Sequence, residues 1–571
     1  MCGIFCSVAR HGFVSPDDAT KELLRNRGPD STGQKQLTID AKTPGNLETS
    51  ARLHATFLST VLSLRGDTVV EQPLQDEKTT STLCWNGEAW TVAGKPVTGN
   101  DSQLIFTSLL SATTNAESIE ASILAVVALL ASVRGPYAFV FYDATHRLVY
   151  YGRDCLGRRS LLRKTVSDHS IILSSVCDNA SGESWTEVEA DGVYILDLTS
   201  SASNSLLASV GHVPNRLSVQ EDDESLVFTL PFSTMNREIP PVAYLHQDAV
   251  ARLKDSLQRS LKLRTAHIRE ALPNASASAH KEEANVAVLF SGGLDCTILA
   301  RMCHDLLQLD QGIDLLNVAF ENPRIHSNLA DDVSPYELCP DRVTGRASFA
   351  ELKQVCPGRH WQFVKVNVPY TETVAHRPKV MALMHPHNTE MDLSISFALY
   401  FASRGAGVVD TARSDTISYT TPARVLLSGL GADELFGGYQ RHATAFARQG
   451  YDGLLDELDL DFKRLGKRNL GRDDRIISNA GREVRFPFLD EDFIALALRL
   501  PAMVKCDFGK PQVDGAEDPV EALEPAKRIL RLLAWNLGME KVAGEKKRAI
   551  QFGARTAKME TGRTKGTHVL V

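Results

Sequence analysis

The 571-residue sequence lacks several features that would assign it at once to a broad class of protein. Its ten cysteines form no Cys-x-x-Cys pair, which excludes the common zinc and dithiol spacings. The formal net charge is −8 at pH 7, so the composition gives no electrostatic argument for nucleic-acid binding. The chain does not open on a basic segment followed by an apolar one. We therefore expect no signal peptide and a cytoplasmic protein with free thiols.

Long hydrophobic runs are also missing. The longest mainly apolar stretch is 121–133, whereas a helix that spans a bilayer needs about 20 residues. We therefore expect a buried helix at 121–133 and no membrane association. With 43% hydrophobic and 23% charged residues, the composition is typical of a globular protein. Its length allows roughly two to four domains.

Residues 2–185 alternate short β-rich runs with turn signals, which predicts an α+β domain with mostly antiparallel strands. We expect helices over 16–26 and 101–133. The predicted strands cover 55–64, 82–85, 137–142, 148–152 and 171–175. Between 186 and 245 the sequence becomes serine-rich and acidic and reaches a pair of prolines, which indicates a linker or a variable region.

From 246 to 571 the pattern changes to apolar strands alternating with helices. Apolar residues recurring every three or four positions predict a helix over 248–272. Nearly unbroken apolar runs are typical of strands buried on both faces of a parallel sheet; they occupy 285–290, 315–320 and 425–428. Helices over 297–308 and 393–404 lie between them. This part of the chain therefore predicts a doubly wound α/β domain.

Cys2 directly follows the initiator methionine. If Met1 is removed, Cys2 carries a free α-amine beside its thiol, and such an amine titrates at about 7.7–8.0. One residue then supplies both a nucleophile and a general base, as in N-terminal nucleophile enzymes. A cysteine also occurs at this position by chance, so this prediction depends on the motifs that follow.

Two glycine-rich turns follow apolar strands. The first, Ser291-Gly292-Gly293-Leu294-Asp295, favours phosphate binding by backbone amides at the start of a helix, with a plain strand-to-helix turn as the alternative. The second turn begins at Ser428-Gly429 and continues into two acids, Asp433 and Glu434. Carboxylates beside a nucleotide suit Mg²⁺, although acids also favour the first turn of a helix by themselves.

These motifs resemble the asparagine synthetase family. SGGLDCT at 291–297 and SGLGADELFGGY at 428–439 resemble its synthetase half, which has a pyrophosphatase-loop ATP fold. RDDR at 472–475 and EVRFPFLD at 483–490 resemble the C-terminal part of that half. The first part of the chain resembles the class II glutamine amidotransferase domain, through MCGI at 1–4, RGPD at 27–30, LRG at 64–66, NGE at 86–88, ND at 100–101 and RDCLG at 153–157.

The resemblance implies an N-terminal nucleophile glutaminase domain of α+β fold, over 2–185. Cys2 would attack the glutamine carboxamide and release ammonia, with Asn86 and Gly87 forming the oxyanion hole. The remaining glutamine contacts would be Arg65 on the α-carboxylate, and Glu88 and Asp101 on the α-ammonium.

The resemblance also implies an α/β doubly wound, pyrophosphatase-loop ATP domain over 246–571. Its implied ATP contacts are Phe290, Ser291, Gly292, Gly293, Asp295, Val318, Ser428 and Gly429. Asp295 and Asp433 would bind Mg²⁺. The implied reaction is that of a glutamine-hydrolysing ligase for asparagine biosynthesis, in which an aspartate β-carboxylate is adenylated with ATP and attacked by ammonia. Its partners would be the small molecules glutamine, aspartate and ATP, and the sequence sets no oligomeric state.

Three positions depart from the family pattern. Leu430 stands where the family carries a glutamate, which removes a proton donor or acceptor worth roughly 10²–10⁴ in rate. Cys296 replaces a serine, a better hydrogen-bond donor. The lysine that the family places before a late Gln-Phe pair is shifted, and the basic run 544–548 allows a phosphate site, a solvated face or a nuclear address.

Leu430 keeps two alternatives open beside amide synthesis. In the first, the chain is a binding or regulatory protein that keeps the fold but forms no amide. In the second, it is a glutaminase joined to an ATP domain that catalyses no synthesis.

Overall fold

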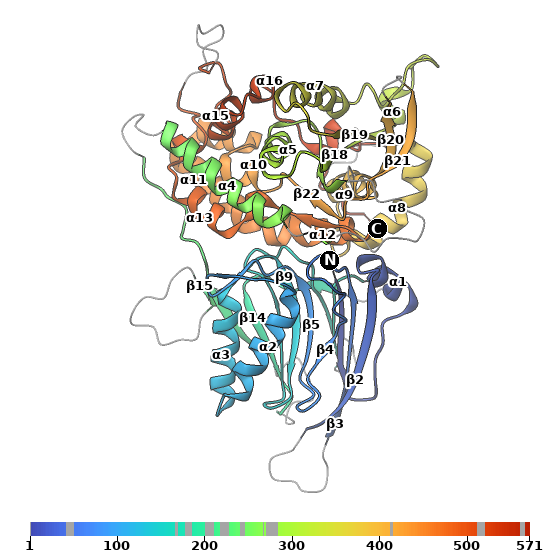
Figure 1. The fold of residues 1–571 in the computed structure, drawn as a ribbon, viewed down its shortest axis with the longest axis vertical. Helices are drawn as coiled ribbons and strands as arrows, with labels where there is room; N and C mark the ends of the chain where they lie inside the picture. Colours follow the sequence, from blue (N-terminus) through green and yellow to red (C-terminus); the bar gives the residue numbers. More distant parts are fainter. Residues whose placement is uncertain are drawn as a thin grey trace. The chain divides into compact units, whose positions relative to one another are not determined.

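The computed structural model describes most of the chain, and Figure 1 shows its fold. The described residues are 2–41, 51–165, 170–177, 185–199, 210–216, 228–239, 246–266, 268–269, 284–411, 415–510, 520–559 and 566–570. The chain divides into two compact units by its internal contacts. Unit 1 comprises Met1–Leu230, Ala382–His387 and Leu465–Arg482, and unit 2 comprises Pro231–Met381, Asn388–Arg464 and Glu483–Val571.

Two sheets form the body of unit 1, and nearly all of their neighbouring strands are antiparallel. The first has the order β13-β11-β12-β1-β3-β2, with bounds Trp185–Glu187, Leu162–Thr165, Ile171–Ser174, Gly3–Ala9, Ala51–Val61 and Ser31–Ala41. The second has the order β16-β15-β14-β10-β9-β5-β4, with bounds Phe228–Thr229, Val210–Arg216, Gly192–Asp197, Leu148–Arg153, Tyr137–Asp143, Thr82–Gly87 and Leu74–Gln75. The exception is the β15–β16 pair, which is parallel. This α+β arrangement agrees with the expectation for 2–185.

The side chains of the second sheet separate into two cores because successive residues of a strand point to opposite faces. Along β9, Val140 joins Ile4 of β1 in one core. Its neighbour Phe139 joins the other core, to which helices contribute Ile105 and Val127. A strand buried on both faces shows no alternation of polar and apolar residues, which explains the continuous apolar sequence of 137–142.

The helical prediction for 101–133 requires correction. The structure has two helices there, α2 Asp101–Thr114 and α3 Ile119–Ser132. Ser118 begins the second helix because its hydroxyl accepts a hydrogen bond from the backbone N–H of Ala121, at 3.2 Å. Helix α3 is also less buried than its apolar sequence indicated, since Leu124 is 57% exposed. One side of the helix packs on the sheet, and composition cannot tell which residues take that side.

The region 186–245 also differs from the prediction of a linker or variable stretch. It supplies β14, β15 and β16 to the second sheet of unit 1. Residues 200–209, 217–227 and 240–245, which include the serine-rich and acidic runs, lie outside the described residues.

Two segments from the second half of the chain belong to unit 1. Residues 382–387 are one of them, and 465–482 are the other. The longer segment contains α12, Gly471–Ser478, whose eight residues are all buried. The sequence analysis placed both segments in the predicted α/β domain over 246–571, because nothing in their sequence set them apart from it.

Unit 2 is built on a sheet with the order β21-β20-β19-β18-β17-β22-β23. Five neighbouring strands are parallel: β19 Trp361–Val368, β18 Gly312–Phe320, β17 Ala284–Leu289, β22 Val425–Leu427 and β23 Glu483–Arg485. Strand β20 Ala406–Asp410 is antiparallel to β19, and the edge strand β21 Thr416–Thr420 is antiparallel to β20. The chain adds β18 on one side of β17 and β22 on the other. The carboxyl ends of β17 and β22 therefore flank a point where the strand order reverses, which is where α/β sheets bind ligands.

The helices of unit 2 connect these strands. They include α4 His246–Thr265, α5 Leu294–Leu306, α7 Pro340–Val355, α9 Glu390–Ser403, α10 Ala432–Phe436, α11 Gln440–Leu465, α13 Glu491–Arg499, α15 Arg528–Asn536 and α17 Ile550–Gly553. The predicted strands at 285–290, 315–320 and 425–428 and the helices at 297–308 and 393–404 are confirmed within a few residues. The helix predicted over 248–272 ends at Thr265, and 270–272 lie outside the described residues. Across the described parts of the chain, no helix has both the length and the apolar content needed to cross a membrane.

Candidate functional site

Cys2 lies at the start of β1, and hydrogen bonds hold it on both sides of its α-carbon. Its backbone nitrogen donates to Asn86 Oδ1 at 3.0 Å, and its carbonyl accepts from Arg27 Nε at 3.2 Å. The next residue, Gly3, donates its N–H to Thr60 Oγ1 at 3.0 Å. Cys2 is 8% exposed. The thiol therefore projects from a fixed piece of backbone, and Met1 lies outside the described residues.

Asn86 and Gly87 come from the end of β5, beside Cys2. Asn86 is completely buried, and its Nδ2 has no hydrogen-bond partner among the residues that the structure describes. A buried amide donor without a partner is costly, and such groups often serve a ligand. A Cβ on Gly87 would lie 2.6 Å from the Pro136 carbonyl oxygen, so only glycine fits this position. The pair suits the predicted oxyanion hole.

The predicted contacts to the glutamine α-groups lie close together. Arg65 donates to the carbonyls of Ala89 at 2.8 Å and Val97 at 2.6 Å, and its Nη1 is 3.6 Å from Glu88 Oε2. Asp101 begins α2, and its Oδ2 accepts hydrogen bonds from the Trp85 indole and the Ala89 N–H. Burial raises the pKa of the Asp101 carboxyl, and the nearby Arg65 opposes this shift.

Sequence reasoning missed Gln72, which lies beside the thiol. Its Nε2 is 4.0 Å from Cys2 Sγ, and its Oε1 accepts the Trp85 N–H at 2.7 Å. Gln72 lies outside every motif that carried the resemblance, so no sequence signal pointed to it. Within unit 1, Asn86 and Gln72 thus contact Cys2 directly. Glu88 follows Gly87 in the chain and pairs with Arg65, and Asp101 bonds to the neighbouring Trp85 and Ala89.

In unit 2, the turn after β17 is shaped by glycine. Gly292 has φ +81°, and a Cβ on it would collide with the backbone nitrogen of Gly345 in α7. Ser348 of the same helix donates to the Gly292 carbonyl at 2.6 Å. The Gly293 N–H donates to Ser291 Oγ at 3.3 Å, and Gly293 caps the start of α5. Helix α7 therefore supports the turn that presents backbone amides at the start of a helix, a known arrangement for anions.

The second turn lies next to the first. Gly429 packs on the first turn, since a Cβ there would lie 2.9 Å from the Cβ of Asp295. Ser428 Oγ accepts the Leu430 N–H at 3.3 Å. Phe290 and Val318, predicted to contact the nucleotide, are 2% and 8% exposed at the ends of β17 and β18. Any contact with a ligand from these two would be made largely by backbone atoms.

The two predicted metal ligands face the same ammonium group. Lys527 Nζ lies 2.6 Å from Asp295 Oδ2 and 2.6 Å from Asp433 Oδ1. Lys547 forms a second ion pair with Asp433. Burial alone would lower the pKa of Lys527, but the two carboxylates outweigh burial and raise it above its usual value. Burial likewise favours protonation of Asp433, but the two lysines hold the pKa of its carboxyl well below the usual range.

Lys527 also escaped the sequence analysis. It has a left-handed backbone conformation, φ +56°, directly before α15, and its side chain is 4% exposed. No motif in the sequence marks it, because its partners lie about a hundred and more than two hundred residues away along the chain. Only the fold brings its charge between the two carboxylates.

The donor set at these carboxylates fits Mg²⁺. Both residues offer oxygen ligands, and the buried Asp295 Oδ1 has no hydrogen-bond partner within the described ranges. Mg²⁺ is usually bound by one or two carboxylates together with substrate phosphates, and these two converge beside the glycine turns. Asp295 and Asp433 would hold the ion, which would neutralise phosphate charge.

Shortly after Leu430 in the sequence, α10 carries a buried acid, Glu434. Glu434 is 2% exposed, and its Oε1 accepts a hydrogen bond from the Tyr439 hydroxyl at 2.6 Å. Its Oε2 has no hydrogen-bond partner among the described residues. Burial, with the charge of Asp433 beside it, raises the pKa of Glu434 to about 7. Leu430 itself is half-buried.

The basic run 544–548 contributes to the same region. Lys547 pairs with Asp433, and Arg548 Nη1 donates to Thr344 Oγ1 at 3.0 Å. Thr344 directly precedes the Gly345 that packs on the Gly292 turn. Lys547 and Arg548 of this run therefore lie at the two glycine turns, as the phosphate-site alternative expects, whereas Lys546 is exposed.

Comparison with known proteins identifies the family. A family model for asparagine synthase matches residues 413–459 and 447–564. Asparagine synthetase domain-containing protein 1 of Gallus gallus is 32% identical over 661 residues, covering 100% of this chain and 99% of that protein. The chain belongs to the asparagine synthase family.

More distant matches cover parts of the chain. Asparagine synthetase B [glutamine-hydrolyzing] of Escherichia coli is 31% identical over 127 residues, covering 21% of this chain and 22% of that protein. A solved structure of a glutamine PRPP amidotransferase from B. subtilis covers 64% of this chain and 91% of its own, with 13% identity and a TM-score of 0.24.

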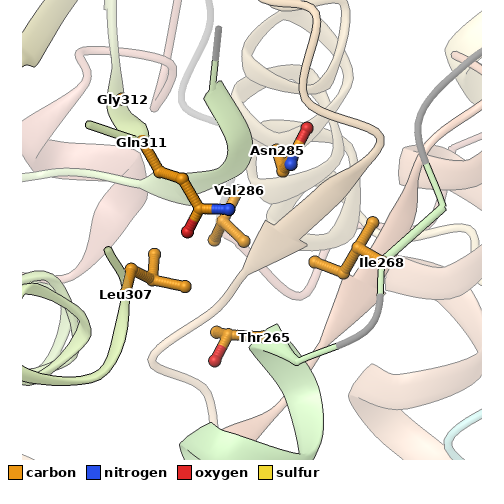
Figure 2. Close-up of a pocket in the computed structure, with 7 residues that line it drawn as sticks. All are labelled: Thr265, Ile268, Asn285, Val286, Leu307, Gln311 and Gly312. Atoms are coloured by element: carbon orange, nitrogen blue, oxygen red, sulfur yellow. The ribbon is translucent and has the colours of Figure 1, made fainter. Parts of the chain in front are cut away.

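A pocket of about 260 Å³ lies elsewhere in unit 2 of this family member (Figure 2). Asn285 and Val286 line it at the start of β17, and Gln311 and Gly312 at the start of β18. The glycine turns follow the opposite, carboxyl ends of the strands. None of the predicted site residues lines this pocket.

Proposed function

We propose that the protein is a glutamine-hydrolysing, ATP-dependent amidotransferase that makes asparagine from aspartate. The observation that carries the proposal is the pair of glycine turns at the adjacent carboxyl ends of β17 and β22, where Asp295 and Asp433 converge on Lys527. Two carboxylates and a lysine beside phosphate-binding turns suit the transfer of a nucleotidyl group. The buried Asn86 amide beside Cys2 supports the glutamine half.

In the glutamine half, the thiol of Cys2 attacks the side-chain carboxamide carbon. The α-amine of Cys2, exposed once Met1 is removed, accepts the thiol proton. Asn86 Nδ2 and the Gly87 N–H donate hydrogen bonds to the oxyanion, and the carbon–nitrogen bond then breaks to release ammonia. Water hydrolyses the remaining thioester to glutamate. Arg65, Glu88 and Asp101 hold the α-carboxylate and α-ammonium of the substrate.

In the ATP half, the β-carboxylate of aspartate attacks the α-phosphorus of ATP and pyrophosphate leaves. Ammonia then attacks the acyl carbon, and AMP leaves as asparagine forms. The backbone of the two turns and Lys527 would hold the phosphates, while Asp295 and Asp433 would hold Mg²⁺. Lys527 is already neutralised by carboxylates, so it can shift its ammonium toward phosphate oxygens without leaving a buried charge unpaired.

The test is the complete reaction with purified protein, glutamine, aspartate, ATP and Mg²⁺. We expect asparagine, AMP, pyrophosphate and glutamate to form in equal amounts. A parallel reaction supplies an ammonium salt in place of glutamine and so tests the ATP-dependent step without glutamine hydrolysis. If AMP and pyrophosphate form from neither nitrogen source, the synthetase assignment is wrong.

A second candidate function follows from Leu430, a glutaminase whose ATP domain binds nucleotide without synthesis. The discriminating variant is Leu430→Glu, which restores the family carboxylate. Under this alternative, the wild type releases glutamate and binds ATP but forms no AMP. AMP formation by the wild type would exclude it. A large gain on Leu430→Glu over a weak wild-type rate would show that the leucine limits the synthetase step.

A further inference from the structure

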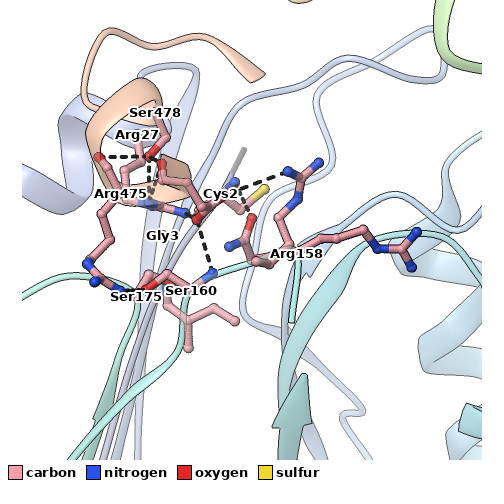
Figure 3. Close-up of polar contacts among 12 residues, drawn as sticks. Cys2, Gly3, Arg27, Arg158, Ser160, Ser175, Arg475 and Ser478 are labelled. Carbon is pink, nitrogen blue, oxygen red and sulfur yellow. Dashed lines mark hydrogen bonds and ion pairs between the residues drawn. The ribbon is translucent and has the colours of Figure 1, made fainter. Parts of the chain in front are cut away.

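A buried arginine connects the start of the chain to a helix from its second half (Figure 3). Arg27 Nε donates to the Cys2 carbonyl at 3.2 Å. The other nitrogens of this guanidinium reach α12, where Nη2 is 2.8 Å from Asp474 Oδ2 and Nη1 is 2.5 Å from Ser478 Oγ. Arg27 and Asp474 are separated by 447 positions in sequence, and both belong to unit 1.

Arg27 requires a partner of opposite charge. Its side chain is 0% exposed, and a buried guanidinium is stable only when it is paired and hydrogen-bonded. Asp474 is also 0% exposed and supplies that charge. Because a guanidinium is a planar fork, fixing its Nη2 and Nη1 on α12 also fixes the direction of the Nε–H toward Cys2.

Asp474 is itself held by unit 1. The same Oδ2 accepts the backbone N–H of Ser160 at 3.1 Å, and Oδ1 is 3.5 Å from Arg159 Nη1. One carboxylate oxygen, Oδ2, therefore bonds both to the Ser160 backbone and to Arg27. A chain of rigid contacts runs from the Ser160 backbone through Asp474 and Arg27 to the Cys2 carbonyl.

The position of Cys2 is sensitive to this chain. Residues at the start of a chain fray unless they are tied down, and once Met1 is removed Cys2 is such a residue. Its thiol must reach the substrate carbon in a narrow geometry, and a misplacement of about 1 Å costs roughly 10²-fold in rate. Loss of the bond to the Cys2 carbonyl would remove one of the contacts that fix the peptide after Cys2, beside the bond from the Gly3 N–H to Thr60 Oγ1.

We propose that Asp474 is a positioning residue for glutamine hydrolysis, which acts through Arg27 to hold the Cys2 carbonyl and so to aim the thiol. This inference rests on the proposed glutaminase activity of Cys2. It means that the glutamine half is completed by α12, a helix encoded in the part of the sequence that resembles the synthetase half.

A neighbouring ion pair provides a matched control. Arg475, the next residue of α12, lies 2.5 Å from Glu187 Oε1 and donates to Ser160 Oγ at 2.8 Å. Glu187 is largely buried, and Arg475 draws the pKa of its carboxyl well below the usual range against the effect of burial. This pair also connects α12 to the N-terminal part of unit 1, but its described contacts include neither Arg27 nor Cys2.

The experiment compares full-length Asp474→Asn and Glu187→Gln. Both variants remove one buried charge that anchors α12. We expect Asp474→Asn to lower kcat for glutamine hydrolysis about 10- to 100-fold, with KM changed by less than about 3-fold. We expect Glu187→Gln to lower the unfolding temperature comparably while leaving kcat within about 3-fold of wild type. Equal kcat losses in the two variants, or an effect of Asp474→Asn on KM alone, would overturn the proposal.

A second variant covers the case in which Asp474→Asn does not fold. Arg27→Lys keeps a positive charge for Asp474 but lacks the Nε–H that holds the Cys2 carbonyl. We expect it to lower kcat to a similar extent, and a wild-type kcat in a folded Arg27→Lys protein would refute the role of the chain of contacts.

A chemical readout separates failure of this inference from failure of the proposed function. Alkylation at Cys2 is followed by mass spectrometry with two probes, a glutamine-shaped diazoketone and the small reagent iodoacetamide. We expect Asp474→Asn to slow the diazoketone about 10-fold or more and iodoacetamide little. Absence of glutamine hydrolysis in the wild type would refute the proposed function, while the alkylation ratio would still test the positioning role. Equal slowing with both probes, or no slowing, would refute that role.

Discussion

The predicted glutamine site and the predicted nucleotide site of this molecule differ in how the chain brings their residues together. The predicted glutamine residues lie between Cys2 and Asp101, and hydrogen bonds to neighbouring backbone and side chains of unit 1 hold Cys2, Arg65 and Asp101. The nucleotide region instead brings Asp295, Asp433 and Lys527 together from distant parts of the chain through ion pairs. Short sequence motifs therefore contain the predicted residues of the first site, although the Arg27–Asp474 pair behind Cys2 comes together only in the fold. In the second site, tertiary structure brings the charged groups themselves together.

The largest expected effect is on glutamine hydrolysis alone, with the ATP-dependent reaction unchanged. Cys2→Ala removes the nucleophile, so we expect glutamate release to fall by at least about 10³-fold. Ammonia-dependent AMP formation should continue at the wild-type rate because no residue of unit 2 changes. The measurements are glutamate by coupled assay and AMP by chromatography. Glutamate release that persists in the variant would disprove the nucleophile role.

A smaller but still large effect is expected in unit 2. Lys527→Met leaves Asp295 and Asp433 without their shared cation, and removes a charge beside the phosphates. We expect AMP formation to fall by about 10²–10³-fold, with glutamine hydrolysis unchanged. Lys546→Met is the matched control, since Lys546 is exposed beside the paired Lys547, and it should have no effect. Equal effects of the two lysine variants would show that net charge, rather than the bridge, matters.

An oxyanion-hole variant tests whether the glutamine region depends on its buried amide. Asn86→Ala removes both the Nδ2 donor and the acceptor for the Cys2 nitrogen. We expect kcat for glutamine hydrolysis to fall by roughly 10²-fold, the usual cost of one such donor. Gln72→Ala, which also alters a neighbour of the thiol, should cost less. A greater loss with Gln72→Ala would place the oxyanion elsewhere.

A stability effect is expected from the glycine turn. Gly292 has φ +81° and lies against the Gly345 backbone, so Gly292→Ala combines a strained conformation with a collision. Gly358→Ala is the matched control, since Gly358 has φ +80° with open space around its α-carbon. The strained conformation alone costs about 1–2 kcal/mol. We expect chemical denaturation of Gly358→Ala to show a loss of that size in the free energy of unfolding. Gly292→Ala should lose more free energy of unfolding and should also bind ATP more weakly. Equal losses would mean that α7 yields to the added methyl group.

The smallest effect is expected at a conservative departure from the family. Cys296 Sγ donates a weak hydrogen bond to the Gly293 carbonyl at 3.3 Å. Cys296→Ser substitutes a better donor, and a neutral hydrogen bond contributes about 0.5–1.5 kcal/mol. We expect ATP affinity, measured by calorimetry, to rise by about 2- to 5-fold. A loss of affinity would show that burial of the larger sulfur atom matters more than the hydrogen bond.

The sequence anticipated most regular elements and the two glycine turns. Continuous apolar runs predicted β17, β18 and β22 because a strand buried on both faces requires apolar side chains at every position. The break between α2 and α3 was missed, since Ser118 acts as a cap only when the preceding helix ends there. The strands within 186–245 were missed because short strands with turn-like sequence depend on their neighbours for pairing.

Some site residues could not be predicted from the sequence because their partners lie in distant segments of the chain. Lys527 and Gln72 belong to no local pattern. Lys527 contacts Asp295 and Asp433, and Gln72 contacts Cys2, all of which come from other segments. The RDDR string at 472–475 was visible as a family resemblance, but nothing in its composition indicated that α12 packs in unit 1.

The sequence alone determined most of the longer strands, the glycine turns and the short motifs that contain Cys2, Asn86, Asp295 and Asp433. These features follow from residue type and spacing within a few positions, because backbone geometry and local burial act over that range. The tertiary structure decided which charges meet: Lys527 between two carboxylates, and Asp474 against the Arg27 that holds Cys2. A buried ion pair depends on distance and desolvation, and both are properties of the folded chain rather than of the order of its residues.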